Sequence, residues 1–150
     1  MGLRVEEFTA GQRWTTRGRT VGEADIMQFA GLVGDYTPIH VDEHYARSTP
    51  FGGRIAHGPL AMSMAIGLFS QAGVLDDSVI GLLHLDWNFR AAVKIGDTVH
   101  AQVAVAEARL ASKPGTGVVK FVFDLRNQDG LTVQSGTMTV LMKARSDAPR

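Results

Sequence analysis

The segment from Gly34 to His40 contains two residue types that can move protons. Asp35 and His40 lie five positions apart, and Pro38 stands between them. Because proline fixes its own φ and keeps the preceding residue extended, the sequence predicts a loop that brings the carboxyl and imidazole groups to one small volume. Imidazole can take a proton from water near neutral pH, and a neighbouring carboxyl group can orient that water or return a proton. Burial would raise the pKa of the Asp35 carboxyl and favour it as a proton donor.

The elements that must position these two residues are predicted to be helices. Apolar residues recur at helical intervals before the loop, and Thr20 and Glu23 have capping-box spacing, so we expect a helix at about Gly22 to Val33. Asp42 can cap a short helix that runs through Ala46. After a break at residues 48–53, Pro59 opens a helix from Leu60 to Gln71 that is apolar on nearly every side and should be enclosed.

The second half of the chain has the two-residue period of strands. Buried-type residues alternate with more polar ones at positions 99–105 and 119–125, and the loop Asn127–Gly130 has hairpin chemistry. We expect a final strand from about Leu131 to Met142, a frayed tail from Ala144 to Arg150, and a short edge strand from Gln12 to Arg19. This order predicts an α+β fold in which an antiparallel sheet curls around the long helix.

Composition excludes several classes of function. The 150 residues suit a single domain spanning 1–150, and the balance of 15 Lys plus Arg against 15 Asp plus Glu argues against nucleic-acid or membrane partners. The longest apolar stretch, Gly58–Phe69, is too short to cross a bilayer, and no signal-peptide core begins the chain, so we expect a soluble, cytoplasmic protein. The absence of cysteine excludes disulfides, thiolate zinc sites and cysteine nucleophiles.

Two motifs in the first half of the chain resemble a known family. The pattern Gly-Asp-x-x-Pro-Ile-His at 34–40, followed after five residues by Ala46, and the run Gly-Arg-Ile-Ala-His-Gly at 53–58 resemble the MaoC-like (R)-specific enoyl-CoA hydratases and dehydratases, which have the hotdog fold. The resemblance implies that Asp35 and His40 are the catalytic pair, that the Gly58 amide holds the thioester carbonyl oxygen, and that Ser63 braces the aspartate. This chain departs from the family pattern at Thr37, where asparagine is usual, and at Val33, where a small residue is usual.

The residue chemistry fits that reaction. Water addition to an enoyl thioester builds negative charge on the carbonyl oxygen, so the site needs a donor aimed at that atom. The unpaired amides and dipole of a helix N-terminus favour an anion, and glycine admits close approach. Loss of one such donor costs roughly 3 kcal/mol of transition-state stabilisation. The backbone amide of Gly58 can supply this hydrogen-bond donor.

Other polar residues allow more than one interpretation. We expect His57 to brace the start of the long helix rather than to touch substrate, while Ser63 could support the aspartate or only bond back to a carbonyl of its own helix. Thr37 can donate and accept one hydrogen bond, but it lacks the two-ended amide of asparagine. The remaining histidines have no metal-like spacing, so we expect no metal. Three cationic side chains could bind the phosphates of coenzyme A: Arg54, Arg90 and Lys94. Exposed cationic side chains are, however, more often simply solvated.

The resulting hypothesis is a hydro-lyase that interconverts enoyl-CoA and (R)-3-hydroxyacyl-CoA, with the thioester as substrate, no cofactor, and a homodimer or higher homo-oligomer as the working form. Two alternatives stay open: a non-catalytic subunit that binds acyl thioesters, and a thioesterase, which is disfavoured because the long helix contains no Asp or Glu. The carrier can be coenzyme A or acyl carrier protein. The acyl length depends on where bulky residues point: Phe51, Phe69 and Trp87.

Overall fold

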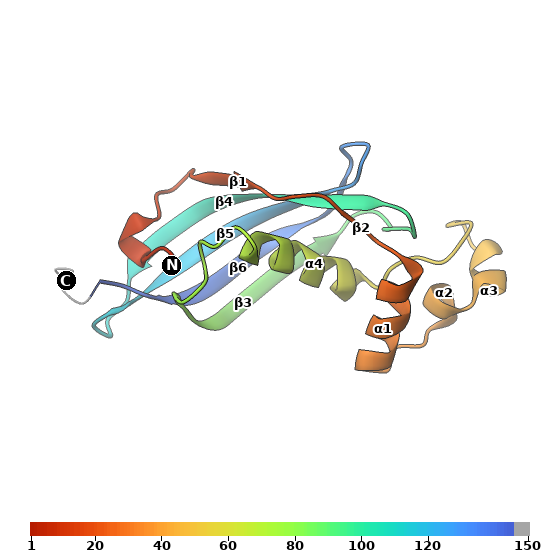
Figure 1. Cartoon of the computed structure of the whole chain (residues 1–150), viewed down its shortest axis with the longest axis horizontal. Helices are drawn as coiled ribbons and strands as arrows, with labels where there is room; N and C mark the ends of the chain where they lie inside the picture. The colour runs from red at the N-terminus through yellow and green to blue at the C-terminus, as the bar shows by residue number, and fades with distance from the viewer. Residues whose placement is uncertain (146–150) are drawn as a thin grey trace.

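A curved antiparallel sheet forms the body of the protein (Figure 1). The computed structural model describes residues 1–145. The strand order is β1-β4-β5-β6-β3, and β2 also pairs with β4. The strands are β1 (Arg13–Thr15), β2 (Arg19–Thr20), β3 (Val79–Phe89), β4 (Thr98–Leu110), β5 (Thr116–Arg126) and β6 (Thr132–Lys143).

The two-residue period of the sequence is confirmed in the central strands. Alternate residues are buried along β4 and β5, and eight of them belong to the core: Val99, Ala101, Val103, Val105, Val119, Phe121, Phe123 and Leu125. The predicted hairpin between β5 and β6 is also present, because the Asn127 side chain accepts hydrogen bonds from the amides of Asp129 and Leu131 and Gly130 adopts a φ of 77°. The antiparallel pairing of these strands therefore follows the prediction.

The long helix, α4 (Gly58–Ser70), lies along the concave face of the sheet (Figure 1). Its buried side is apolar and packs into the core: Leu60, Ala61, Met64, Ala65, Leu68 and Phe69. The expectation that the whole helix is enclosed is wrong for this chain, because Ser63, Gly67 and Ser70 are exposed. Serine and glycine are small and only weakly polar, so the sequence did not indicate a solvent-facing side of the helix, yet these three residues leave one side of α4 exposed to solvent.

Three short helices lie beyond the N-terminal end of α4 (Figure 1): α1 (Glu23–Val33), α2 (Pro38–Val41) and α3 (Glu43–Arg47). The predicted Thr20–Glu23 capping box is wrong, because Thr20 belongs to β2 and the amide of Gly22 donates to Asp25 Oδ2 instead. Backbone hydrogen bonds between Val21 and residues 96–97 hold this part of the chain extended up to the helix. The helix predicted at about Gly22 to Val33 is confirmed, since α1 begins at Glu23 and ends at Val33.

The predicted loop between α1 and α3 contains a helical turn. Pro38 occupies the first position of α2, where its missing amide is not needed, so the proline starts a helix rather than only ending one. The predicted cap of α3 is confirmed by a 2.9 Å hydrogen bond from the Tyr45 amide to Asp42 Oδ1. His40 therefore projects from a short helix instead of a loop.

Expectations for the two ends of the chain were met in part. The predicted edge strand exists but is split into β1 and β2. The frayed tail is wrong for its first two residues, because Ala144 is buried and bonds Gly115, and the Arg145 amide donates to the carboxylate of Glu6. The remainder of that predicted tail, 146–150, lies outside the described residues. No helix in the described part of the chain has the length and apolar character to cross a membrane.

Candidate active site

Asp35 and His40 face each other, as their types and spacing predict. Asp35 follows the end of α1, where Gly34 takes a left-handed conformation with a φ of 78° and turns the chain, and His40 lies in α2. The distance from His40 Nε2 to Asp35 Oδ2 is 4.0 Å. This separation is too long for a direct hydrogen bond, so the two side chains leave room for an intervening group.

The hydrogen bonds of His40 define which nitrogen faces Asp35. Nδ1 lies 2.8 Å from the carbonyl oxygen of Ile55. Because a carbonyl oxygen only accepts, Nδ1–H must donate, and the lone pair of the neutral ring is then on Nε2. The side chain is 13% exposed, so the ring is held in place while its basic nitrogen points toward the aspartate.

The Asp35 carboxylate is anchored by Thr37. The Thr37 hydroxyl donates to Oδ1 at 2.6 Å, and the Thr37 amide donates to the same oxygen at 3.1 Å. These bonds to the charged form hold the pKa of Asp35 below its usual value, with the side-chain hydrogen bond as the main cause. The expectation of a pKa raised by burial is therefore wrong, because the side chain is 45% exposed. Asp35 is an anion at neutral pH, and Oδ2 is left to face His40.

His57 is buried behind the pair. Its Nε2–H donates to the main-chain oxygen of Asp35 at 3.0 Å, and its ring stacks on His40 with centroids 3.9 Å apart and planes 23° apart. Phe29 packs on the ring with a centroid distance of 4.9 Å. These contacts are those of a residue that braces the aspartate and the imidazole. Nδ1 of His57 has no hydrogen-bond partner in the described part of the chain.

Gly58, the predicted donor to the thioester oxygen, lines a cavity of about 340 Å³. This cavity is lined mainly by apolar residues together with His40, Arg90 and Gln134. Gly58 is the first residue of α4, and its amide has no backbone or side-chain acceptor among residues 1–145. Phe89 lies directly over this glycine, since a Cβ added there would sit 2.8 Å from two ring carbons. His40 and the first residue of α4 thus line the same cavity, whereas Asp35 is not among its lining residues.

Gln134 is a site residue that the sequence analysis missed. It is buried in β6, where its Nε2 donates to the Gly58 carbonyl oxygen at 3.0 Å and its Oε1 accepts from Trp87 Nε1 at 2.9 Å. The sequence offered one indication of this role, because Gln134 is a polar residue at a position of the alternating strand where a buried residue is expected. Of the bulky residues considered for acyl length, Phe51 lines the cavity, whereas Phe69 packs in the core against Phe121.

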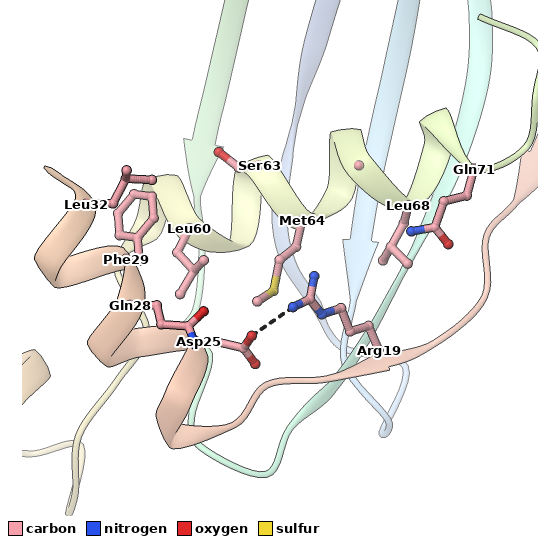
Figure 2. Close-up of a pocket in the computed structure, with 11 residues that line it drawn as sticks. Arg19, Asp25, Gln28, Phe29, Leu32, Leu60, Ser63, Met64, Leu68 and Gln71 are labelled. Atoms are coloured by element: carbon pink, nitrogen blue, oxygen red, sulfur yellow. Dashed lines mark hydrogen bonds and ion pairs between the residues drawn. The ribbon is translucent and has the colours of Figure 1, made fainter. Parts of the chain in front are cut away.

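Ser63 is not brought to Asp35. No hydrogen bond joins the two among the described residues, and Ser63 lines a different cavity of about 310 Å³ between α1 and α4. Figure 2 shows its side chain on the side of α4 that faces away from the Arg19–Asp25 ion pair. The bracing role implied for Ser63 is therefore carried in this chain by other contacts, from Thr37 and His57.

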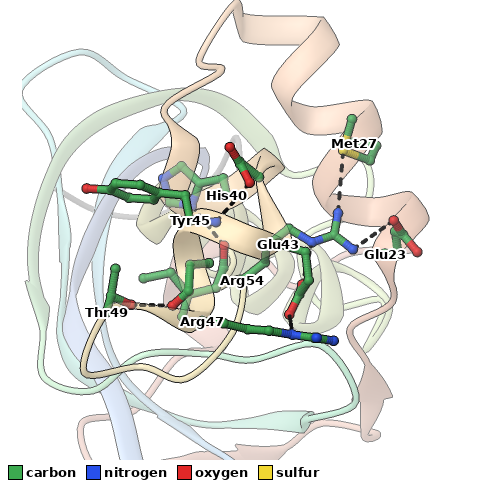
Figure 3. Close-up of polar contacts among 11 residues, drawn as sticks. Glu23, Met27, His40, Glu43, Tyr45, Arg47, Thr49 and Arg54 are labelled. Carbon is green, nitrogen blue, oxygen red and sulfur yellow. Dashed lines mark hydrogen bonds and ion pairs between the residues drawn. The ribbon is translucent and has the colours of Figure 1, made fainter.

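The candidate phosphate-binding cations differ in their availability. Arg54 is engaged by two carboxylates, Glu23 and Glu43, each at 2.8 Å (Figure 3). Arg90 lines the cavity and is held by a 2.8 Å hydrogen bond from its Nε to Ser135 Oγ. Lys94 lies in the turn before β4, where its amide donates to Asp97. Of the three, only Arg90 borders the cavity.

Three side chains lie close enough to be considered as metal ligands: Asp35, His40 and His57. However, each imidazole already uses one nitrogen on a main-chain carbonyl, and the two rings are stacked. The in-plane lone pairs of stacked rings run side by side instead of converging on one ion. This arrangement suits a water molecule between Asp35 and His40 better than a cation.

Curated relatives of this chain include a hydratase and a dehydratase. An (R)-specific enoyl-CoA hydratase from Rhodospirillum rubrum is 36% identical over 149 residues, which cover 93% of this chain and 92% of the relative. A 3-hydroxybutyryl-CoA dehydratase from Methylorubrum extorquens is 42% identical over 93 residues. That alignment covers 59% of this chain and 55% of the longer relative.

The fold has a counterpart in a Mycobacterium tuberculosis protein described as a double hotdog. The TM-score is 0.83 at 18% identity, and the match covers 99% of this chain and 46% of that one, which supports the predicted hotdog fold. Residues 6–123 match the MaoC like domain family. The chain therefore belongs to the MaoC-like dehydratase family and has its α+β hotdog fold.

Proposed function

We propose that this protein catalyses the reversible hydration of an enoyl-CoA to the (R)-3-hydroxyacyl-CoA, with Asp35 and His40 as catalytic residues and the Gly58 amide as the oxyanion donor. Membership of a hydratase and dehydratase family supports hydro-lyase chemistry. The observation that carries the proposal is the 4.0 Å separation of His40 Nε2 and Asp35 Oδ2 beside a cavity that contains Gly58.

The separation suits one water molecule. A water oxygen about 2.8 Å from both atoms, an ordinary hydrogen-bond length, makes an angle of roughly 90° between them. Both atoms are acceptors, since the Asp35 carboxylate is ionised and Nε2 carries the lone pair in the Nδ1–H tautomer of His40. Each can therefore accept one proton of the water, which leaves an oxygen lone pair free to attack carbon.

The proton path follows from these roles. As the water oxygen bonds to the β-carbon, its proton passes to His40 Nε2, and the electron pair of the double bond moves toward the thioester oxygen. The Gly58 amide donates to that oxygen while it carries negative charge. His40 then returns the proton to the α-carbon, which completes the addition of water with no net change in the protein. Asp35 stays ionised and stabilises the imidazolium.

The test is a panel of trans-2-enoyl-CoA substrates of increasing acyl length. Loss of the conjugated double bond is followed by absorbance, and the product is analysed on a chiral column. We expect the (R)-alcohol, with activity abolished in Asp35→Asn and in His40→Gln while the thermal unfolding midpoint of both variants stays close to that of the parent. Turnover by Asp35→Asn would refute the assignment.

Thiol release and acyl-CoA binding, measured beside the absorbance assay, separate the two alternatives. A thioesterase would release free thiol from acyl-CoA, although α4 contains no carboxylate that could activate water at the carbonyl carbon. A non-catalytic subunit would bind acyl-CoA tightly without any change in enoyl absorbance. Running the panel with acyl carrier protein in place of coenzyme A determines the carrier. A cytoplasmic location and the lack of a cofactor remain part of the proposal.

We further propose that the protein is a homodimer joined through β3. This strand is at the end of the sheet order and exposes Ile80, Leu82, Leu83 and Phe89. An apolar edge of this length favours pairing with another strand. Light scattering should show a dimer for the parent and for Leu131→Glu, a control at an exposed leucine outside the strands, and a monomer for Leu83→Glu. A monomeric parent would refute this proposal.

A further inference from the structure

Arg54 connects two helices that flank the Asp35–His40 segment. It lies in the chain between α3 and α4, and its side chain is only 12% exposed. Nη2 bonds Glu23 Oε1, on the first residue of α1, and Nε bonds Glu43 Oε2, on the first residue of α3, each at 2.8 Å. Figure 3 shows the guanidinium between the two carboxylates. One cation thus holds the helices on both sides of the segment.

The residue after Arg54 contacts the imidazole directly. The Ile55 carbonyl oxygen accepts the 2.8 Å hydrogen bond from His40 Nδ1, and the Ile55 amide donates to the carbonyl of Ile39 at 3.3 Å. A shift of the Arg54 backbone would therefore move the group that orients His40. Arg54 itself does not line the cavity that contains Gly58, so it has no contact with the proposed substrate position.

The chemistry of the two ion pairs requires an arginine. A guanidinium presents several donors in a planar fork, so it can serve two carboxylates at once, whereas a lysine ammonium acts as a single point charge. The same contacts hold the pKa of Glu43 below its usual value, with the Arg54 hydrogen bond as the main cause. Because the side chains of Glu23 and Glu43 are 64% and 39% exposed, loss of Arg54 leaves both carboxylates able to meet water. The effect on overall stability should be modest compared with the effect on geometry.

We propose that Arg54 is a positioning residue that holds α1, α3 and the Ile55 carbonyl in the arrangement which aligns His40 with Asp35. The kinetic test of this proposal rests on the proposed hydratase function, whereas the structural test by NMR does not. A misplacement of about 1 Å at a reacting group can reduce a rate roughly a hundredfold. Loss of the alignment should therefore lower kcat and leave KM nearly unchanged.

The kinetic test compares Arg54→Lys and Arg54→Met with a matched control, Arg47→Met. Arg47 is an exposed residue that pairs with the same Glu43 at 3.2 Å but does not reach α1. With an enoyl-CoA substrate, we expect kcat to fall at least about tenfold in Arg54→Met, and KM to change less than about threefold. Arg54→Lys should recover only part of the loss, and Arg47→Met should behave like the parent. An unchanged kcat in Arg54→Met, or an equal loss in Arg47→Met, would overturn the proposal.

A double-mutant cycle tests the bridge itself. If Glu23 acts only through Arg54, then Arg54→Met/Glu23→Gln should be no slower than Arg54→Met alone, because both changes break one interaction. Additive losses in kcat would show that Arg54 acts in another way. Thermal unfolding of each variant identifies any general loss of folding.

An NMR measurement separates this proposal from the proposed function. The imidazole ¹⁵N shifts of His40 report its tautomer, which in the parent should be the Nδ1–H form that donates to Ile55. Arg54→Met should give a mixture of tautomers, and Arg47→Met should not. A parent without hydratase activity would refute the proposed function, while an unchanged tautomer in Arg54→Met would refute the positioning role.

Discussion

Replacement of Gly58 by alanine tests how closely the amide at the start of α4 is packed. The added Cβ would lie 2.8 Å from Cδ1 and Cε1 of Phe89, whereas carbon atoms normally approach to about 3.5–4.0 Å. The ring must therefore retreat by roughly 1 Å. Overpacking of this kind costs about 1–3 kcal/mol, and we expect the lower end because Phe89 is 56% exposed and can turn outward. A loss of about 1 kcal/mol corresponds to a melting temperature lower by roughly 2–4 °C.

The expected loss of activity is larger than the loss of stability. Phe89 and Gly58 line the same cavity, so the new methyl group and the displaced ring both occupy the approach to the free amide. Removal of an oxyanion donor reduces kcat roughly a hundredfold or more, and we expect a loss of that order in Gly58→Ala. The double variant Gly58→Ala/Phe89→Ala should relieve the ring contact but retain the methyl group, so it should stay slow.

The assay pairs enoyl-CoA hydration with thermal unfolding. Gly67→Ala is the matched control, because Gly67 lies in the same helix and a Cβ added there would have nothing within 4 Å of it. Alanine at this position should stabilise the helix by up to about 1 kcal/mol. The activity of Gly67→Ala should equal that of the parent. Hydration by Gly58→Ala within about threefold of the parent would refute the argument that this amide needs an unobstructed approach.

Three further results are expected. Thr37→Val removes the main cause of the lowered pKa of Asp35, so that pKa should rise and the acidic limb of the pH–rate profile should move to higher pH; an unmoved limb would contradict the role given to Asp35. Gln134→Leu leaves the Gly58 carbonyl without its side-chain donor, and kcat should fall more than KM changes in steady-state kinetics. Hydrogen bonds from Gly2 and then Arg4 lower the pKa of Asp77 to about 2. The stabilisation that ionised Asp77 gives is therefore present above about pH 4 and is lost as the pH falls toward 2. In urea unfolding, the free energy of unfolding of Asp77→Asn should depend less on pH over that range than that of the parent.

Much of the fold could be predicted because its signals are local. The alternation in β4 and β5 and the cap at Asp42 each depend on residues a few positions apart, and they were confirmed. The errors arose where a distant contact overrode a local pattern. Thr20 has the spacing of a helix cap, but its hydroxyl bonds Thr98 in the neighbouring strand. The error at Pro38 has a local cause instead, because proline fits the first position of the helical turn that carries His40.

The electrostatics of the site also depended on tertiary placement. The sequence identified Asp35 and His40 as a pair, but it could not show that Asp35 is half exposed, that Thr37 stabilises its charged form, or that Ile55 selects the His40 tautomer. These features determine that the aspartate is an anion and that His40 Nε2 carries the basic lone pair.

The sequence by itself determined which side chains can exchange protons, where most of the helices and strands lie, and that the long apolar helix packs on a sheet. The tertiary structure decided that β3 lies at one edge of the sheet, that Gln134 reaches Gly58 across 76 positions, and that Arg54 joins Glu23 and Glu43. The physical reason is the distance in sequence over which each effect acts. Periodicity and capping involve residues that are near neighbours in the chain, whereas alignment of the site depends on contacts between residues that only folding brings together.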